Sequence, residues 1–149
     1  MLESYSFERL SEHQVIEILR IMSPQFDPPL SADMNIDEYA KKLSDNATFV
    51  LCKNVDIIAL IAYYKNMPKA QIYIPLVWVD QAYRGNGISR TMFNLLLEKG
   101  KKEGFNNSEL EVLKANNNAI KLYNSLGYIK EGEHGNKYLM RYNFDNTDI

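Results

Sequence analysis

Apolar residues recur at helical spacing in four stretches of the chain. In residues 12–22, EHQVIEILRIM, Val, Ile, Leu and Met return every three or four positions, as on the buried face of a helix. Ser11 stands directly before this stretch, where its hydroxyl can accept a hydrogen bond from a free amide of the first turn. The same spacing predicts three further helices, at 36–44, from 87 to about 103, and at 117–127, the last ended by a glycine.

Shorter β-branched and apolar runs predict strands at 4–7, 47–52, 56–64, 71–79, 108–113, 128–132 and 137–144. The turn signal KNVD between the second and third runs indicates a hairpin. Pro75 is unusual inside its strand, because proline removes a ladder hydrogen bond and is mostly confined to edges and bulges. The order of elements predicts one mixed α/β domain, residues 1–149, built on a single sheet.

Composition and charge limit the classes of protein to which this chain can belong. The chain has 149 residues, 46% of them hydrophobic, and a net charge of -2, which fits one soluble domain and provides no basic surface for nucleic acid. No apolar run approaches the roughly 20 residues that cross a bilayer, and the first residues lack the pattern of a secretory signal. We therefore expect a cytoplasmic protein with neither a membrane nor a nucleic-acid partner. The single cysteine, Cys52, lies in an apolar run and is expected to be a core thiol.

The turn between the strand at 71–79 and the following helix is a candidate anion site. It contains Gly85 and Gly87, which permit positive φ and a close approach to the main chain, and the start of the helix offers unpaired amides. A plain strand-to-helix turn explains the two glycines equally well. The Lys-Ser/Thr pair of a Walker A loop is missing, and Arg90 stands where a dinucleotide-binding fingerprint needs a third small residue.

Two segments in the right order distinguish these alternatives. Residues 79–89 read VDQAYRGNGIS and residues 110–128 read LEVLKANNNAIKLYNSLGY. Together they resemble the GCN5-related N-acetyltransferase family, with its acetyl-CoA loop Arg/Gln-x-x-Gly-x-Gly/Ala and its later motif Asn-x-x-Ala-x-x-Leu-Tyr-x-x-x-Gly-Phe/Tyr. The resemblance covers about residues 72 to 143. Ser89 departs from the family's Gly or Ala, so its hydroxyl is expected either to cap the helix or to crowd the pyrophosphate.

The resemblance implies a mostly antiparallel sheet, splayed at a V-shaped cofactor gap, with about four helices. Acetyl-CoA would be the cosubstrate, and the gap would be marked by a bulge near Pro75. The pyrophosphate would bind the backbone amides of Arg84, Gly85, Asn86, Gly87, Ile88 and Ser89. The pantetheine arm would pair with the main chain of Trp78 and Val79 like an added strand. Asn116 resembles the asparagine that contacts this arm, although it can also be the cap of the helix that begins at 117.

The resemblance also implies two catalytic residues. Tyr123 matches the tyrosine that donates a proton to the departing thiolate, although a tyrosine on a helix facing a sheet can equally be a core residue. Glu111 matches the general base of the ribosomal-protein N-terminal acetyltransferases. Strand alternation places Glu111 on the face opposite to Leu110 and Val112, and a merely solvated glutamate is the alternative.

The function implied is an N-acetyltransferase that transfers the acetyl group directly to a primary amine in a ternary complex, without a metal. The acceptor is either a peptide N-terminus, as the Glu111 pattern suggests, or a small molecule such as an amino sugar, polyamine or aminoglycoside. The Pro-rich loop 23–35 and the helix at 36–44 are expected to form the lip of the acceptor site. A domain that binds acyl-CoA without turnover is the alternative from another class. His13 and His134 lie outside both motifs and are assigned to the surface.

Overall fold

The structure is a computed structural model, and it describes residues 3–26, 28–32 and 34–145. It consists of two compact units. The first contains the described residues up to Ala62 together with Leu76–Met92, and the second contains Tyr63–Pro75 and the residues from Phe93 onward. Two strands and one helix run from one unit into the other, so both units are parts of one α/β fold.

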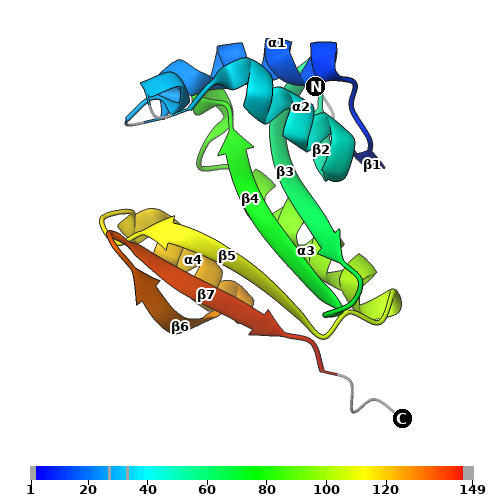
Figure 1. Cartoon of the computed structure of the whole chain (residues 1–149), viewed down its shortest axis with the longest axis vertical. Coiled ribbons are helices and arrows are strands. Elements are labelled where there is room, and N and C mark those ends of the chain that lie inside the picture. The colour runs from blue at the N-terminus through cyan, green and yellow to red at the C-terminus, as the bar shows by residue number, and fades with distance from the viewer. Residues whose placement is uncertain (1–2, 27, 33, 146–149) are drawn as a thin grey trace. The chain divides into compact units, whose positions relative to one another are not determined.

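The elements agree closely with those predicted from the sequence (Figure 1). The helices are α1 Glu12–Met22, α2 Ile36–Asn46, α3 Ile88–Lys102 and α4 Asn117–Leu126, with short 3-10 turns η1 Ser23–Gln25, η2 Leu30–Ala32 and η3 Gln81–Tyr83. The strands are β1 Ser4–Glu8, β2 Thr48–Lys53, β3 Ile57–Asn66, β4 Gln71–Val79, β5 Asn107–Leu113, β6 Ile129–His134 and β7 Lys137–Asn143. Within the predicted loop 23–35, Asp27 and Asp33 lie outside the described residues.

The seven strands form one sheet in the order β1-β2-β3-β4-β5-β7-β6. The pairs β1–β2, β5–β7 and β6–β7 are antiparallel, whereas β4 and β5 are parallel. The mixed, mostly antiparallel fold class is thereby confirmed. The β4–β5 register ends at Ile74 and Leu110, directly before Pro75, which has no amide hydrogen to donate to a ladder. Among the described pairings, a register shift occurs in β6, between Lys130 and Gly132. The bulge expected near Pro75 stays a prediction.

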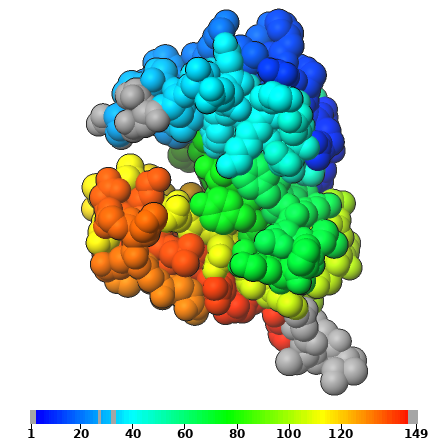
Figure 2. Space-filling model, in the orientation of Figure 1, coloured from blue at the N-terminus to red at the C-terminus, as the bar shows by residue number. Residues whose placement is uncertain are grey.

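In the first unit, helices α1 and α2 lie side by side (Figure 1). Helix α1 begins with a full capping box, because the Ser11 hydroxyl accepts from the Gln14 amide at 3.2 Å and the Gln14 side chain accepts from the Ser11 amide at 2.9 Å. Its apolar face buries Val15, Leu19 and Met22. The outer face of α2, cyan in Figure 2, lies at the surface.

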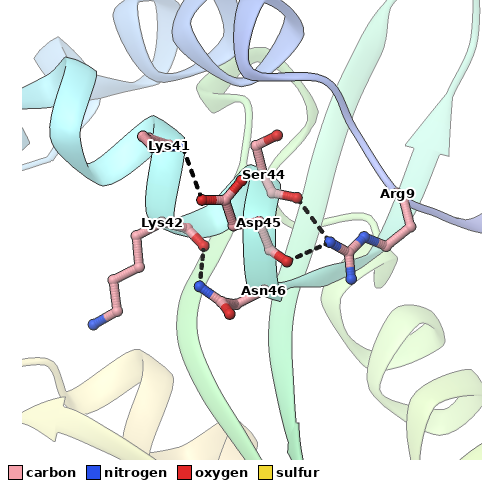
Figure 3. Close-up of polar contacts among 6 residues, drawn as sticks. All are labelled: Arg9, Lys41, Lys42, Ser44, Asp45 and Asn46. Carbon is pink, nitrogen blue, oxygen red and sulfur yellow. Dashed lines mark hydrogen bonds and ion pairs between the residues drawn. The ribbon is translucent and has the colours of Figure 1, made fainter.

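The C-terminal end of α2 is held by a residue from outside the helix (Figure 3). Arg9 donates from Nη2 to the carbonyl oxygens of Ser44 and Asp45 at 2.8 and 2.7 Å. The last carbonyls of a helix have no partner within it, so a cation here satisfies them and also favours the negative end of the helix dipole. This contact fixes α2 to the segment that connects β1 and α1.

The second unit has an aromatic core. Phe93, Tyr123 and Tyr128 contact one another with ring centroids 5.4 to 6.0 Å apart, and Tyr142 and Phe144 extend the cluster. Gly127 ends α4 with φ of 108°, as its position in the sequence predicts.

In the first unit Cys52 is buried, which raises the pKa of its thiol and agrees with a core role. Over the described residues, no helix is long and apolar enough to cross a membrane.

Candidate active site

The turn after β4 has the backbone geometry of an anion site. Gly85 and Gly87 have φ of 83° and 78°, and a Cβ atom added to either would meet no heavy atom within 4 Å. The Gly87 carbonyl accepts from the Thr91 amide at 3.1 Å, so Gly87 occupies the N-cap position of α3. The amides of Ile88 and Ser89 therefore have no partner within the helix. Open space over two glycines and free amides at a helix start are what a bound phosphate group requires.

Side chains of the turn hold its shape. Asn86 donates to the Tyr83 carbonyl at 3.0 Å, and Arg84 donates from Nε to the Val79 carbonyl at 3.0 Å. The charge of Arg84 is thus held at the end of β4. Ser89 is the second residue of α3, so the cap position expected for its hydroxyl belongs to Gly87.

Two residues of the predicted acetyl-CoA site have buried side chains. Trp78 is 3% exposed and Ile88 is 4% exposed, so their side chains belong to the core. Burial alternates along β4, with Trp78 buried and Val79 half-buried. Any ligand contact of Trp78 and Ile88 must therefore involve the main chain, as expected for an arm that pairs like an added strand.

The second unit contains the predicted carboxylate. Glu111 lies on β5 opposite the buried Leu110 and Val112, as strand alternation predicts, and its side chain is 26% exposed. Tyr73 donates to Oε1 of Glu111 at 3.4 Å. Burial, followed by the charge of Glu111 and this hydrogen bond, raises the pKa of Tyr73, so the phenol stays protonated and remains a donor.

Glu111 differs in its partners from the other carboxylate on the same face of β5. Glu109 is neutralised by Arg141, whose Nε lies 2.8 Å from Oε2. The partners of Glu111 in the described structure are Tyr73 and His134, neither of which carries a permanent charge. Both oxygens of Glu111 therefore lack a permanent counter-charge and can accept from an approaching ammonium group.

His134 is a neighbour of the site that sequence reasoning did not find. Its side chain is 86% exposed, in agreement with a surface position, but Nδ1 lies 3.4 Å from Oε2 of Glu111. The cause is strand pairing, since Glu111 and Gly132 both align with Leu139 of β7. The two strands predicted at 128–132 and 137–144 were the available signal, because they form the β6–β7 hairpin, and β7 in turn lies between β6 and the strand that carries Glu111.

Helix α4 contributes the remaining predicted residues. Asn116 caps it, because its Oδ1 accepts from the Ala119 amide at 3.2 Å. Tyr123 is 7% exposed and packs edge-on against Phe93, and burial raises the pKa of its hydroxyl to about 12. Among the described residues, no side chain or carbonyl forms a hydrogen bond with this hydroxyl. Tyr123 is thus a core residue whose polar atom has no structural partner there.

The predicted residues are divided between the two units. In the first, the end of β4, the turn and the start of α3 bring together Trp78, Val79 and residues 84–89. In the second, Glu111 lies with Tyr73 and His134, while Tyr123 and Asn116 belong to α4. Over the described residues, no group of three or more His, Cys, Asp or Glu side chains is arranged to hold a metal ion.

Solved structures with this fold are numerous. The PaiA N-acetyltransferase from Thermoplasma acidophilum, in complex with coenzyme A, is 14% identical with a TM-score of 0.76, over 95% of this chain and 99% of that one. Ard1 from Thermoplasma volcanium is 16% identical with a TM-score of 0.77, over 95% and 99%. The ribosomal-protein-S18-alanine N-acetyltransferase from Escherichia coli is 16% identical with a TM-score of 0.73, over 98% and 99%. At such identities the likeness shows the fold.

The sequence itself matches a family. No curated protein is a significant match. The model of the acetyltransferase (GNAT) family, however, matches residues 13–128, which is most of the chain and includes both motifs. The chain therefore belongs to the acetyltransferase (GNAT) family.

Proposed function

We propose that this protein is a single-domain enzyme that transfers the acetyl group of acetyl-CoA directly to a primary amine in a ternary complex. The observation that carries the proposal is Glu111, a partly exposed carboxylate on β5 that no lysine or arginine among the described residues neutralises. A carboxylate in this state can take a proton from an incoming ammonium group. Family membership makes acetyl-CoA the cosubstrate.

The first unit would hold the cosubstrate. The free amides at the start of α3 and the open space at Gly85 and Gly87 fit a pyrophosphate, with Arg84 and Asn86 shaping the turn. The main chain of Trp78 and Val79 lies beyond Ile74, the last residue of β4 that pairs with β5, and would pair with the pantetheine arm. Asn116 would contact the same arm through its amide nitrogen. Bound acetyl-CoA supplies the thioester carbonyl that the amine attacks and the thiolate that leaves.

Glu111 would act as the general base, directly or through a water. At pH 7 an α-amine with a pKa of 7.7 to 8.0 loses its proton for about 1 to 1.4 kcal/mol, whereas a lysine near 10.4 needs about 4.6 kcal/mol. Glu111 accepts this proton, and Tyr73 and His134 orient its two oxygens. Because Glu111 is partly exposed and lacks a permanent counter-charge, it favours turnover over the alternative of acyl-CoA sensing.

Tyr123 would act as the general acid. Its raised pKa keeps the phenol protonated at every working pH, so it always has a proton for the sulfur of the leaving group. Proton transfer from a phenol of pKa about 12 to a thiolate of ordinary pKa near 8.5 is uphill by about 5 kcal/mol, so the larger part of the role would be to donate a hydrogen bond to the sulfur as the thiolate leaves.

The acceptor would be either a peptide N-terminus or a small-molecule amine. The names of two similar structures represent these classes, an alanine N-acetyltransferase of ribosomal protein S18 and a spermidine N-acetyltransferase chimera. An amino sugar and an aminoglycoside belong to the second class. A cytoplasmic location stays a prediction of the sequence.

The test combines a thiol-release assay with one substitution. Acetyl-CoA is incubated with a panel of peptides, polyamines and amino sugars, and Glu111→Gln is then measured with the best amine. The substitution keeps shape and polarity but removes the base, so kcat/KM should fall about 10²- to 10⁴-fold near pH 7. The variant's rate should then rise about tenfold per pH unit until the amine is deprotonated.

The matched control is Glu131→Gln, which removes an exposed carboxylate of β6 and should leave the rate unchanged. Parallel pH profiles of similar height for the wild type and Glu111→Gln would show that Glu111 is not the base. Absence of thiol release with every amine, despite acetyl-CoA binding, would favour sensing.

A further inference from the structure

A single side chain joins the connection between α1 and α2 to the end of β4. Gln25, the last residue of η1, accepts at Oε1 from the Trp78 indole at 3.1 Å and from the Gln81 amide at 3.0 Å. Its Nε2 donates to Oδ1 of Asp80 at 3.0 Å. All four residues belong to the first unit. One amide group thus binds Trp78 near the end of β4 and both residues that directly follow the strand, Asp80 and Gln81.

The chemistry of the partners fixes the orientation of this amide. Indole and backbone N–H groups can only donate, and a carboxylate oxygen can only accept. Oε1 must therefore face Trp78 and Gln81, and Nε2 must face Asp80. The Trp78 side chain is 3% exposed, so its N–H depends on Gln25 in place of water.

Asp80 and the segment that carries Gln25 each make further hydrogen bonds. Asp80 donates its amide to the Ile58 carbonyl and accepts from the Tyr83 amide, both at 2.8 Å, which fixes the strand end. On the other side, the buried Ser23 hydroxyl accepts from the Ser31 amide at 3.1 Å and joins η1 to η2. Gln25 therefore connects two local networks, one in the α1–α2 connection and one at the start of the proposed acetyl-CoA turn.

We propose that Gln25 is a positioning residue that couples acetyl-CoA binding at the end of β4 to ordering of the α1–α2 connection over its described residues 23–26 and 28–32. The inference rests on the proposed function, because it takes Trp78 and Val79 as part of the acetyl-CoA site. A ligand that restricts Trp78 and its neighbours makes the three hydrogen bonds break less often, so the connection opens more rarely. By linkage, ordering the connection strengthens acetyl-CoA binding by the same factor.

The connection is also part of the segment expected to form the acceptor lip. A connection that opens more rarely once acetyl-CoA is bound gives the amine a more rigid binding surface at the time when the acetyl group is available. Gln25 would thus favour the ternary complex over binding of the amine alone.

The test measures amide hydrogen exchange with acetyl-CoA as the ligand. The amides of Phe26 and Ser31 report on the connection, because they bond to the Ser23 carbonyl and hydroxyl at 3.2 and 3.1 Å. In the wild type, saturating acetyl-CoA should slow their exchange about tenfold, a typical coupling factor. Gln25→Leu removes all three hydrogen bonds and should abolish this slowing while calorimetry still detects acetyl-CoA binding.

A second set of variants exchanges the amide and the carboxylate between positions 25 and 80, and so separates loss of coupling from loss of folding. Gln25→Glu still accepts from the indole and the amide but places a carboxylate against Asp80, so the slowing should be lost. Adding Asp80→Asn supplies an amide donor at position 80 and should restore it. Asp80→Asn alone is the control, because the introduced amide oxygen can still accept from Gln25 and coupling should persist.

The outcomes separate this inference from the proposed function. If the wild type does not bind acetyl-CoA, the proposed function is wrong and the coupling with it. If it binds acetyl-CoA but exchange at Phe26 and Ser31 is unchanged, or slows equally in Gln25→Leu, only the coupling is wrong. Failure of the Gln25→Glu, Asp80→Asn double variant to regain the slowing, while Asp80→Asn alone retains it, also overturns it.

Discussion

Two neighbouring tyrosines of the aromatic core are predicted to respond in opposite ways to loss of the hydroxyl group. Tyr123 and Tyr128 are 7% and 1% exposed, and their ring centroids lie 6.0 Å apart. The Tyr128 hydroxyl lies 2.8 Å from Oγ of the fully buried Ser108. The Tyr123 hydroxyl has no such partner among the described residues. Phenylalanine at either position keeps the ring and removes only the oxygen, so the two variants are matched.

For Tyr123→Phe we expect reduced turnover with unchanged stability. Removing this oxygen leaves no described protein group without a hydrogen-bond partner, so the free energy of unfolding should change by less than about 1 kcal/mol. If the hydroxyl is the general acid, kcat should fall about 10- to 100-fold, which corresponds to about 1.4 to 2.7 kcal/mol of transition-state stabilisation.

For Tyr128→Phe we expect the reverse. The Ser108 hydroxyl is left buried without its partner, which costs about 1 to 3 kcal/mol. In a domain of this size each kcal/mol lowers Tm by about 2 to 4 °C, so Tm should fall by roughly 2 to 12 °C while kcat is kept. Ser108→Ala added to Tyr128→Phe removes the stranded hydroxyl and should recover part of the loss.

The assay is kcat at saturating acetyl-CoA with the best amine, together with thermal unfolding of each variant without ligand. Full turnover by Tyr123→Phe would return Tyr123 to a purely structural role. A similar loss of kcat in both variants would mean that packing of the cluster, and not one hydroxyl, controls the rate. A fall in Tm confined to Tyr123→Phe would show that the assignment of the two hydroxyls is reversed.

Two further predictions concern the turn and alkaline stability. Gly87→Asn introduces a side chain into the open space of the turn, with a residue type that tolerates positive φ. The affinity for acetyl-CoA, measured by calorimetry, should fall about tenfold or more. The control is Gly104→Asn, at φ of 83° after α3, which should leave the affinity unchanged. Equal affinities of the two variants would place the pyrophosphate elsewhere. Burial raises the pKa of Tyr123 from 10.0 to about 12, so this tyrosine ionises first in the unfolded state. Its contribution to the free energy of unfolding is fully present below pH 10, and roughly 3 kcal/mol of it should be lost as the pH rises from 10 to 12. Tyr123→Phe should flatten this decline in urea titrations at pH 9 and 11, and an unchanged slope would contradict it.

The sequence determined the elements because their signals are local. The helix predicted at 12–22 is α1, and its cap forms between Ser11 and Gln14, three positions apart. Gly127 ends α4, and Gly85 and Gly87 adopt the positive φ that the turn was predicted to need. Each of these features depends on residues within one turn of each other, so spacing and residue type were sufficient.

The sequence also determined the family and the face of β5 that carries Glu111, since both rest on short motifs and on strand alternation. It left Asn116 and Tyr123 with two interpretations each. The structure shows that Asn116 is a helix cap and that Tyr123 is buried in the core. A ligand role for either is compatible with these positions, because each keeps a polar group that the fold does not require.

Only the tertiary structure decided which distant residues meet. Glu111 and His134 are adjacent because β5 and β6 both pair with β7, and Gln25 reaches Trp78 because α1 ends next to the end of β4. Arg84 turns back to the Val79 carbonyl instead of remaining free. These contacts depend on strand register and on side-chain packing between segments far apart in the chain. Neither is encoded in the residue types of one segment, because a shift of register by one residue would place every side chain on the other face.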